Sequence, residues 1–243
     1  MPDPITRENP AKMKTKPFNW PIVGLLLFLA GIPAIPAPFL MTLAVMGPSA
    51  NELSSIVNAL HFQTPAAVLV HGSSGIAFFL SMPFQFSPLL RAKKPKRHKI
   101  AGIIALASGY VMALSGIWMH HVLSPDSFGA RYLSLVTLSA AICIAFSMAL
   151  THILNGNVPA HRAWMCRAVA ITLGVVTPLF IDILLYLASN STGNSLATLY
   201  QLQHDYGRLL GMAINLGIVE YALHRGRRER VSQIPNSIGV ELS

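Results

Sequence analysis

The sequence predicts an all-α integral membrane protein built as a bundle of six transmembrane helices. Of its 243 residues, 53% are hydrophobic and only 11% are charged, whereas about a quarter of a typical soluble domain is charged. Six apolar segments follow one another, each long enough at about 1.5 Å per residue to cross roughly 30 Å of hydrocarbon. Polar or strongly basic turns separate these segments.

The basic residues predict the orientation of the bundle. The formal net charge is +9, and all but two of the 18 Lys and Arg residues, Arg131 and Arg208, fall on alternate turns or near the ends of the chain. Because Lys and Arg accumulate on the cytoplasmic side, we expect a multi-pass protein of the bacterial cytoplasmic (inner) membrane with both termini in the cytoplasm. This topology accounts for the charge, so membrane lipid is the expected partner and nucleic acid is not.

The chain begins with a polar segment, residues 1–19, which we expect in the cytoplasm. The apolar stretch Trp20–Met46 is longer than the roughly 7–15 residues of a signal-peptide core, so it is predicted to stay as the first span. Pro33, Pro36 and Pro38 remove backbone donors within it. They predict a kink or break midway along this helix.

An outer loop is predicted over residues 47–64. Leu53, Ile56, Val57 and Leu60 recur in it at helical spacing, which predicts a short amphipathic helix on the outer surface.

The remaining spans complete one transmembrane domain of residues 1–243. A basic turn between the second and third spans carries six cations, and a basic tail, 225–243, returns to the cytoplasm. The predicted spans cover 65–90, 98–123, 131–154, 160–188 and 197–224.

The third span contains a regular glycine pattern. Gly102, Gly109 and Gly116 recur every seven residues, and at about 100° per residue they stay near one face of the helix, with His98 and His120. Small residues on one face are typical of a close seam between membrane helices. The alternative is a flat groove against which a porphyrin could lie.

Ionisable residues inside membrane spans are costly and suggest function, and here they fall into two groups by depth. Neutral imidazole is a common axial ligand of haem iron, and two helices can supply both axial positions. The candidates near the outer surface are His71, His120, Asp182, His204 and Arg208. Those near the inner surface are His98, His161, Arg97, Arg162 and Arg167.

The cations beside these histidines fit haem propionates, which pair with Arg or Lys. For the inner arginines, anchoring to anionic lipid is the alternative. Two-haem bundles often carry both ligands of one helix about 14 residues apart, about 21 Å along the axis, and no histidine pair here has that spacing. If two haems are bound, different helices must supply the ligands of each.

Four motifs add a resemblance to a known family. They are Pro83-Phe84-Gln85-Phe86 after His71, His98-Lys99-x-x-Gly102 after the basic turn, Ser115-Gly116, and Ala160-His161-Arg162-x-Trp164-Met165-x-Arg167. Through them, residues 71–187 resemble a bacterial family of predicted multi-span membrane proteins of unknown function. The resemblance implies a four-helix core over 65–188 and a site at His71, His98 and His161. More remotely, the topology and histidines resemble six-span transmembrane b-type cytochromes.

Three functions follow as hypotheses. The first is a cytochrome-like electron-transfer protein that binds haem b through His71, His98, His161 and His204, with a quinone or another redox partner. The second is an intramembrane zinc-dependent hydrolase using His71, Asp182 and His204. The third is a small transporter or lipid-binding scaffold, in which the histidines relay protons or hold headgroups.

Overall fold

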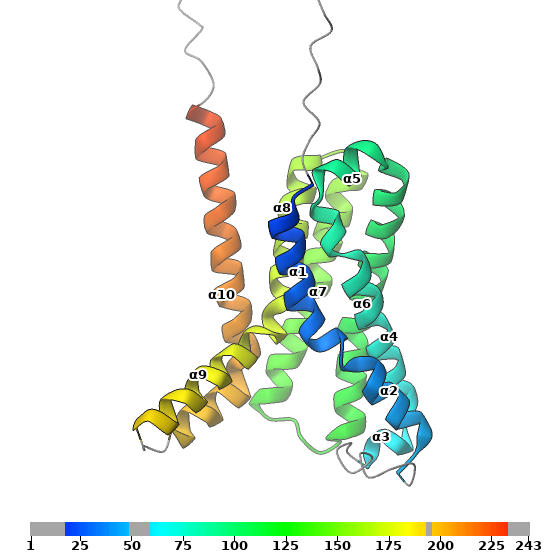
Figure 1. The fold of residues 1–243 in the computed structure, drawn as a ribbon, viewed down its shortest axis with the longest axis vertical. Coiled ribbons are helices and arrows are strands. Elements are labelled where there is room, and N and C mark those ends of the chain that lie inside the picture. Colours follow the sequence, from blue (N-terminus) through cyan, green and yellow to red (C-terminus); the bar gives the residue numbers. More distant parts are fainter. Residues whose placement is uncertain (1–17, 49–58, 193–195, 233–243) are drawn as a thin grey trace, which may run out of the picture.

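The computed structural model describes residues 18–48, 59–192 and 196–232, and these residues form helices joined by short turns (Figure 1). The predicted amphipathic helix around Leu53 lies outside the described residues. The elements are α1 (Trp20–Ala34), α2 (Ala37–Met46), α3 (Leu60–Gln63), α4 (Pro65–Ser81), η2 (Pro83–Phe86), α5 (Pro88–Lys93), α6 (Pro95–Leu123), α7 (Ala130–Leu154), α8 (Val158–Thr172), η3 (Leu173–Val175), α9 (Thr177–Thr192) and α10 (Ala197–Ser232).

Four helices, α4, α6, α7 and α8, form the core of the bundle, and α1 packs beside α4. The buried ring of Phe146 on α7 lies at its centre, 6.2 Å from the ring of Phe78 and 5.9 Å from that of Tyr110. These aromatic contacts join α7 to α4 and α6. All four of these helices lie within residues 65–188, the range over which a four-helix core is expected.

The glycine face of α6 is a packing seam. A Cβ atom added at Gly109 would overlap the ring of Phe146, and one at Gly102 would lie 3.2 Å from Gln85 Oε1. At Gly116 it would lie 3.4 Å from Cε1 of His71. Side chains of the protein thus fill the space beside all three glycines, in agreement with the predicted seam and not with an open groove for a porphyrin.

The predicted break in the first span is confirmed, since α1 ends at Ala34 and α2 begins at Ala37. The second span is shorter than predicted, because α4 ends at Ser81 and is followed by η2 and α5. Pro83 and Pro88 explain this change, since each begins a new helical segment and neither can donate a backbone hydrogen bond.

A second break divides the predicted fifth span, which is not one continuous helix. η3 separates α8 from α9, and the two helical parts meet at a bend of 41°. Pro178 accounts for the break because it lacks an N–H and its ring would clash with the carbonyl of Gly174 in a continuous helix. Asn215 of α10 supplies hydrogen bonds to polar groups on both sides of the break. Its Nδ2 donates to the Ala170 carbonyl (3.1 Å), and its Oδ1 accepts from Thr177 Oγ1 (3.1 Å).

Six spans are not confirmed. Within the described residues, four helical segments are long and apolar enough to cross a membrane, Trp20–Met46, Pro65–Phe86, Pro95–Leu123 and Ala130–Leu154, and the bent pair of α8 and α9 would make a fifth. The predicted sixth span, now α10, does not meet this test; its 36 residues include Asp205, Arg208 and Glu220.

The basic turns and the basic tail were predicted on one side of the bundle and the other loops on the opposite side, and the ends of the bundle agree with this grouping. Figure 1 places α5, the start of α8 and the C-terminal end of α10 at one end, which we call the basic end. The α6–α7 loop and α3 lie at the opposite end.

Candidate functional site

The two helix breaks meet at a cavity in the middle of the bundle. Pro33, Ala34 and Ala37 line it at the first break, and Thr172, Leu173, Val175 and Val176 line it at the second. Side chains of α4, α6 and α7 complete the lining, which is almost entirely apolar. The space open to the centres of water-sized spheres is about 160 Å³, of the order of an apolar cavity of about 150 Å³ that holds benzene.

His71 of α4 is the one ionisable residue among those that line this cavity. Its Nδ1 lies 3.1 Å from Oγ of Ser115, and the Ser115 hydroxyl donates to the Met112 carbonyl at 3.2 Å. Because the serine has one proton and has used it, Nδ1 of His71 is the donor of their bond. Nε2 of a neutral His71 then carries a lone pair and has no hydrogen-bond partner among the described residues.

Two hydroxyl groups add polarity to the cavity wall. Ser139 of α7 is 3% exposed, and its hydroxyl makes no hydrogen bond within the described part of the chain. Thr172 donates to the Ala168 carbonyl at 2.8 Å, which leaves its oxygen free to accept another bond. The lining of the cavity therefore includes one imidazole and two hydroxyl-bearing residues among otherwise apolar side chains.

The basic end gathers a second set of predicted residues. With its nitrogen turned towards His98, the Gln85 amide donates to Nδ1 (3.1 Å) and the carbonyl (3.2 Å) of His98, and its oxygen accepts from the Gly102 amide (3.2 Å). Three residues of the resemblance motifs thus meet in space. In this arrangement neutral His98 carries its proton on Nε2.

His161 of α8 lies close enough to His98 for their charges to interact. Its Nδ1 donates to the Ala149 carbonyl at 2.8 Å, so Nε2 is left as an acceptor. A metal-bound histidine is typically held in this way by a carbonyl on its other nitrogen. The arrangement of His161 is therefore compatible with the predicted ligand role.

The arginines of the basic end differ in environment. Arg91 of α5 is half-buried, and partial burial together with the positive charge of Arg162 lowers its pKa from the usual value. Arg97 and Arg162 are exposed. Arg167 already has a partner: its Nε and Nη2 donate to Glu220 of α10 at 2.5 and 3.0 Å, and its guanidinium lies 4.8 Å from the Trp164 ring centre.

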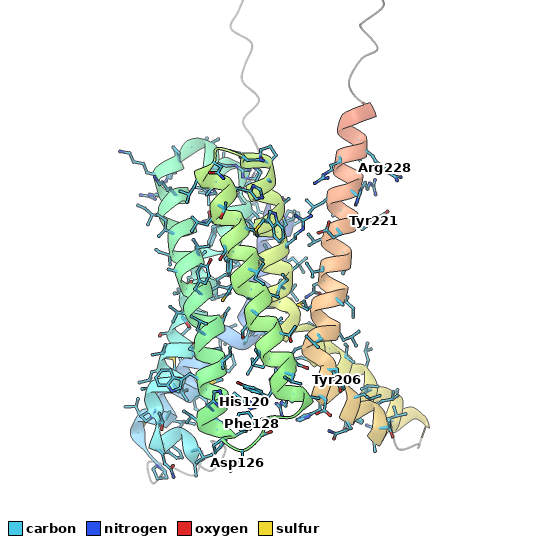
Figure 2. All side chains as sticks on the ribbon, turned by 180° about the vertical axis from the view of Figure 1, so that it is seen from behind. His120, Asp126, Phe128, Tyr206, Tyr221 and Arg228 are labelled. Atoms are coloured by element: carbon cyan, nitrogen blue, oxygen red, sulfur yellow. The ribbon has the colours of Figure 1, made fainter. Side chains whose placement is uncertain are left out.

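The opposite end holds the remaining candidates (Figure 2). Nε2 of His204 accepts from Arg131, and its Nδ1 donates to Asp205 Oδ1 at 3.2 Å. Both ring nitrogens are thus in use, and cofactor binding there would require Arg131 to move. His120 donates from Nε2 to the Ser127 carbonyl at 2.8 Å.

The predicted zinc ligands are not assembled. No group of three or more His, Cys, Asp or Glu side chains that could hold a metal ion occurs among the described residues. His71, Asp182 and His204 therefore do not surround one point. Position along the spans predicted similar depths for His71 and His204, but His71 lines the central cavity whereas His204 bonds Arg131.

Sequence reasoning missed two residues of these sites. Ser139 was one small residue in an apolar span, and Asn215 stood on a helix whose neighbour was unknown. The signal that could have found Asn215 was Pro178, since a helix break leaves carbonyls that need a donor.

Comparison with known proteins agrees with this architecture. A family model described as "Predicted membrane protein (DUF2306)" matches residues 68–215. The chain belongs to the DUF2306 family. The match begins in α4 and ends in α10 at Asn215, so the DUF2306 region contains His71, both sets of histidines and the break in α8–α9, whereas the part of the cavity lining from α1 and α2 lies outside it. No curated protein and no solved structure matches the chain.

Proposed function

We propose that this DUF2306 protein is a membrane-embedded binding protein for a small, mainly apolar molecule with a hydrogen-bond donor, such as an alcohol, a phenol or a quinol headgroup. One observation carries the proposal: His71, whose Nε2 has no hydrogen-bond partner among the described residues, lines an apolar cavity where two helix breaks meet. Of the three hypotheses from the sequence, this develops the transporter or lipid-binding scaffold.

The helix breaks support a binding role. Non-helical backbone at membrane depth is tolerated where protein covers it or where it lines a cavity. Discontinuous helices near the middle of the membrane are also how many transporters build their substrate sites. Here one break comes from α1–α2 and the other from α8–η3–α9, which lie on different sides of the cavity.

The chemistry of the wall defines the ligand class. A hydroxyl of the ligand would donate to Nε2 of His71, and Ser139 and Thr172 could bond a second polar atom. The aromatic and aliphatic side chains around them would bury the apolar body of the ligand. The cavity is smaller than the roughly 300–1,000 Å³ of typical cofactor-sized pockets, which favours a single ring over a macrocycle.

A small phenol that carries a photoreactive diazirine would test the proposal on the full chain in lipid nanodiscs. Irradiation should label peptides of α4 and α7 that line the cavity, and excess phenol should prevent it. Gly75→Leu should abolish most labelling, because a Cβ at Gly75 has Met112 Sδ as its neighbour at 4.0 Å and the leucine would enter the cavity. The matched control is Gly24→Leu, an exposed position with nothing within 4 Å.

His71 variants separate the role of Nε2 from that of cavity shape. His71→Phe should weaken phenol binding about tenfold, as expected for the loss of a hydrogen bond by a buried group. His71→Gln, which keeps an acceptor, should retain more affinity. Equal labelling in wild type and Gly75→Leu would show that the phenol binds elsewhere.

Haem binding is the second candidate, and the pairing of His98 with His161 favours it. Haem b would be held between α6 and α8 near the basic end, with Arg91 and Arg162 for its propionates, and would serve electron transfer to a quinone or redox partner. Nε2 of His161 is free for iron. His98 would ligate only after the Gln85 amide turned, because Nε2 now carries the proton.

Absorption spectra of the purified protein, oxidised and then reduced with dithionite, test this second candidate. A haem spectrum that disappears in His161→Ala would support it, and a colourless protein purified from haem-replete cells would end it. No assembled ligand set supports the zinc hydrolase, so zinc content measured in the same samples serves as a control.

A further inference from the structure

A cluster of basic side chains joins α7 to α10 at the end of the bundle opposite the basic end. It consists of Arg131 in the first turn of α7 and His204, Asp205 and Arg208 of α10, and we call it the outer arginine cluster. Arg131 donates to Nε2 of His204, and Arg208 Nη1 donates to the Arg131 carbonyl at 3.4 Å. Ser134 of α7 adds a bond of 2.6 Å to the Asp205 carbonyl.

The charges within this cluster do not balance. His204 accepts from Arg131 at Nε2 and faces Asp205 through Nδ1, which is the pattern of a neutral imidazole. Asp205 is thus the one carboxylate beside two guanidinium groups, and Gln201 (3.0 Å) and His204 (3.2 Å) already occupy its oxygens. Neither Arg131 nor Arg208 forms an ion pair with a carboxylate within the described ranges. The cluster carries one uncompensated positive charge.

Within the outer arginine cluster, most N–H donors of Arg208 have no hydrogen-bond acceptor among the described residues. Its side chain is half-buried, and the long bond to the Arg131 carbonyl is its one hydrogen bond among the described residues. A guanidinium has five N–H donors, so most of those of Arg208 are free. Removing a charge from water costs free energy that a partner must return, and the neighbouring Arg131 adds repulsion.

The surroundings point to an anion at the membrane surface. Figure 2 shows Tyr206, Phe128 and His120 at this end of the bundle, close to the α6–α7 loop. Tyrosine is enriched at the level of lipid headgroups, so Tyr206 fits that position. A planar guanidinium matches two oxygens of a phosphate group. The one carboxylate of the cluster, Asp205, already accepts from Gln201 and His204 and forms no ion pair with Arg208 among the described residues.

We propose that the outer arginine cluster binds a phosphate group, with Arg131 and Arg208 as its donors. A phosphodiester carries one negative charge and would balance the single excess positive charge. The group can come from a phospholipid headgroup or from a soluble phosphate, and both would bridge α7 to α10. The site is separate from the central cavity and does not depend on what binds there.

Binding would be measured on the full chain in a mild detergent, with dihexanoyl phosphatidylglycerol and inorganic phosphate titrated separately. Arg208→Gln should weaken binding about tenfold, the loss expected for a charge-assisted contact. Arg228→Gln is the matched control, because Arg228 lies on the same helix at the opposite end (Figure 2) and makes the same change of charge. Its affinity should stay within about twofold of wild type.

Thermal unfolding distinguishes a lost binding site from a damaged fold. Without phosphate or lipid, Arg208→Gln should unfold at or above the temperature of wild type, because it removes a repelled charge. At the same high ligand concentration, Arg208→Gln should gain less stability than wild type, because its affinity for the ligand is lower. If Arg208→Gln fails to fold, Arg131→Gln replaces it with the same expected loss.

The two ligands identify the source. Tight binding of the short lipid and weak binding of inorganic phosphate would assign the site to a headgroup, and similar binding of both would assign it to a soluble phosphate. Binding of neither ligand, or equal losses in Arg208→Gln and Arg228→Gln, would overturn the proposal.

Discussion

At the scale of single residues, the neighbours of each histidine decide what it can bind. His71 bonds Ser115 through Nδ1 and has no partner at Nε2 among the described residues, and His161 bonds the Ala149 carbonyl through Nδ1. His204 has both nitrogens engaged. A ligand or a metal needs a free lone pair, so His71 and His161 are suited to binding and His204 is suited to joining α7 to α10.

The tightest packing at this scale is between Gly109 and Phe146. Gly109→Ala should lower the free energy of unfolding by about 1–3 kcal/mol, because the added methyl group overlaps a ring that is 0% exposed and fixed by two aromatic neighbours. Thermal unfolding followed by tryptophan fluorescence would measure the loss. Gly217→Ala on α10, where nothing lies within 4 Å, should be neutral or stabilising. Equal changes in unfolding temperature for the two variants would contradict close packing between Gly109 and Phe146.

At the scale of elements, Asn215 holds the break between α8 and α9 together. Asn215→Leu should cost about 1–3 kcal/mol, since it leaves the Ala170 carbonyl without its donor and Thr177 Oγ1 without its acceptor. Faster hydrogen exchange confined to residues 170–178 and the facing part of α10 would locate the effect. Thr198→Leu, an exposed polar-to-apolar change on the same helix, is the control. Uniform exchange across both variants would show that Asn215 does not support the break.

The first break could be predicted from the sequence, because Pro33, Pro36 and Pro38 interrupt one span within six residues. The second could not be placed as easily, since Pro178 stands alone in a long apolar run. Its stabilisation comes from Asn215, which is 38 residues from Thr177 and 45 residues from Ala170 along the chain. The cavity forms only because both breaks meet. That meeting depends on contacts between residues far apart in the sequence, which hydrophobic periodicity does not predict.

Sequence patterns likewise failed to predict which polar residues meet, because this depends on how the helices pack. The glycine repeat predicted the seam because Gly102, Gly109 and Gly116 share a helix face whatever the neighbours are. Position along the spans predicted similar membrane depths for His71 and His204. Depth does not specify which way a side chain points around its helix axis, or which helix it contacts. Similarly, Arg167 was predicted to face a propionate, and the structure pairs it with Glu220.

At the scale of the whole molecule, the helix ends and loops that lie at each end of the bundle bear on the membrane orientation predicted from the sequence. α5 and the C-terminal end of α10 lie together, with the α6–α7 loop at the other end (Figure 1). α10 contacts α7, α8 and α9, and it is held by Glu220 on the side of the basic end and by the outer arginine cluster at the other. If α10 crosses the membrane, these two contacts compensate for its polar composition.

Cysteine labelling would test this arrangement. Single cysteines at Lys94, Asp126 and Arg228, introduced after Cys143→Ala and Cys166→Ala, should react differently with a membrane-impermeant maleimide in intact spheroplasts. Asp126→Cys should be labelled, whereas Lys94→Cys and Arg228→Cys should be labelled only after the membrane is permeabilised, because the basic segments are retained in the cytoplasm. Labelling of Lys94→Cys in intact cells would reverse the orientation. Labelling of Arg228→Cys together with Asp126→Cys, while Lys94→Cys stays protected, would mean that α10 does not return to the side of α5.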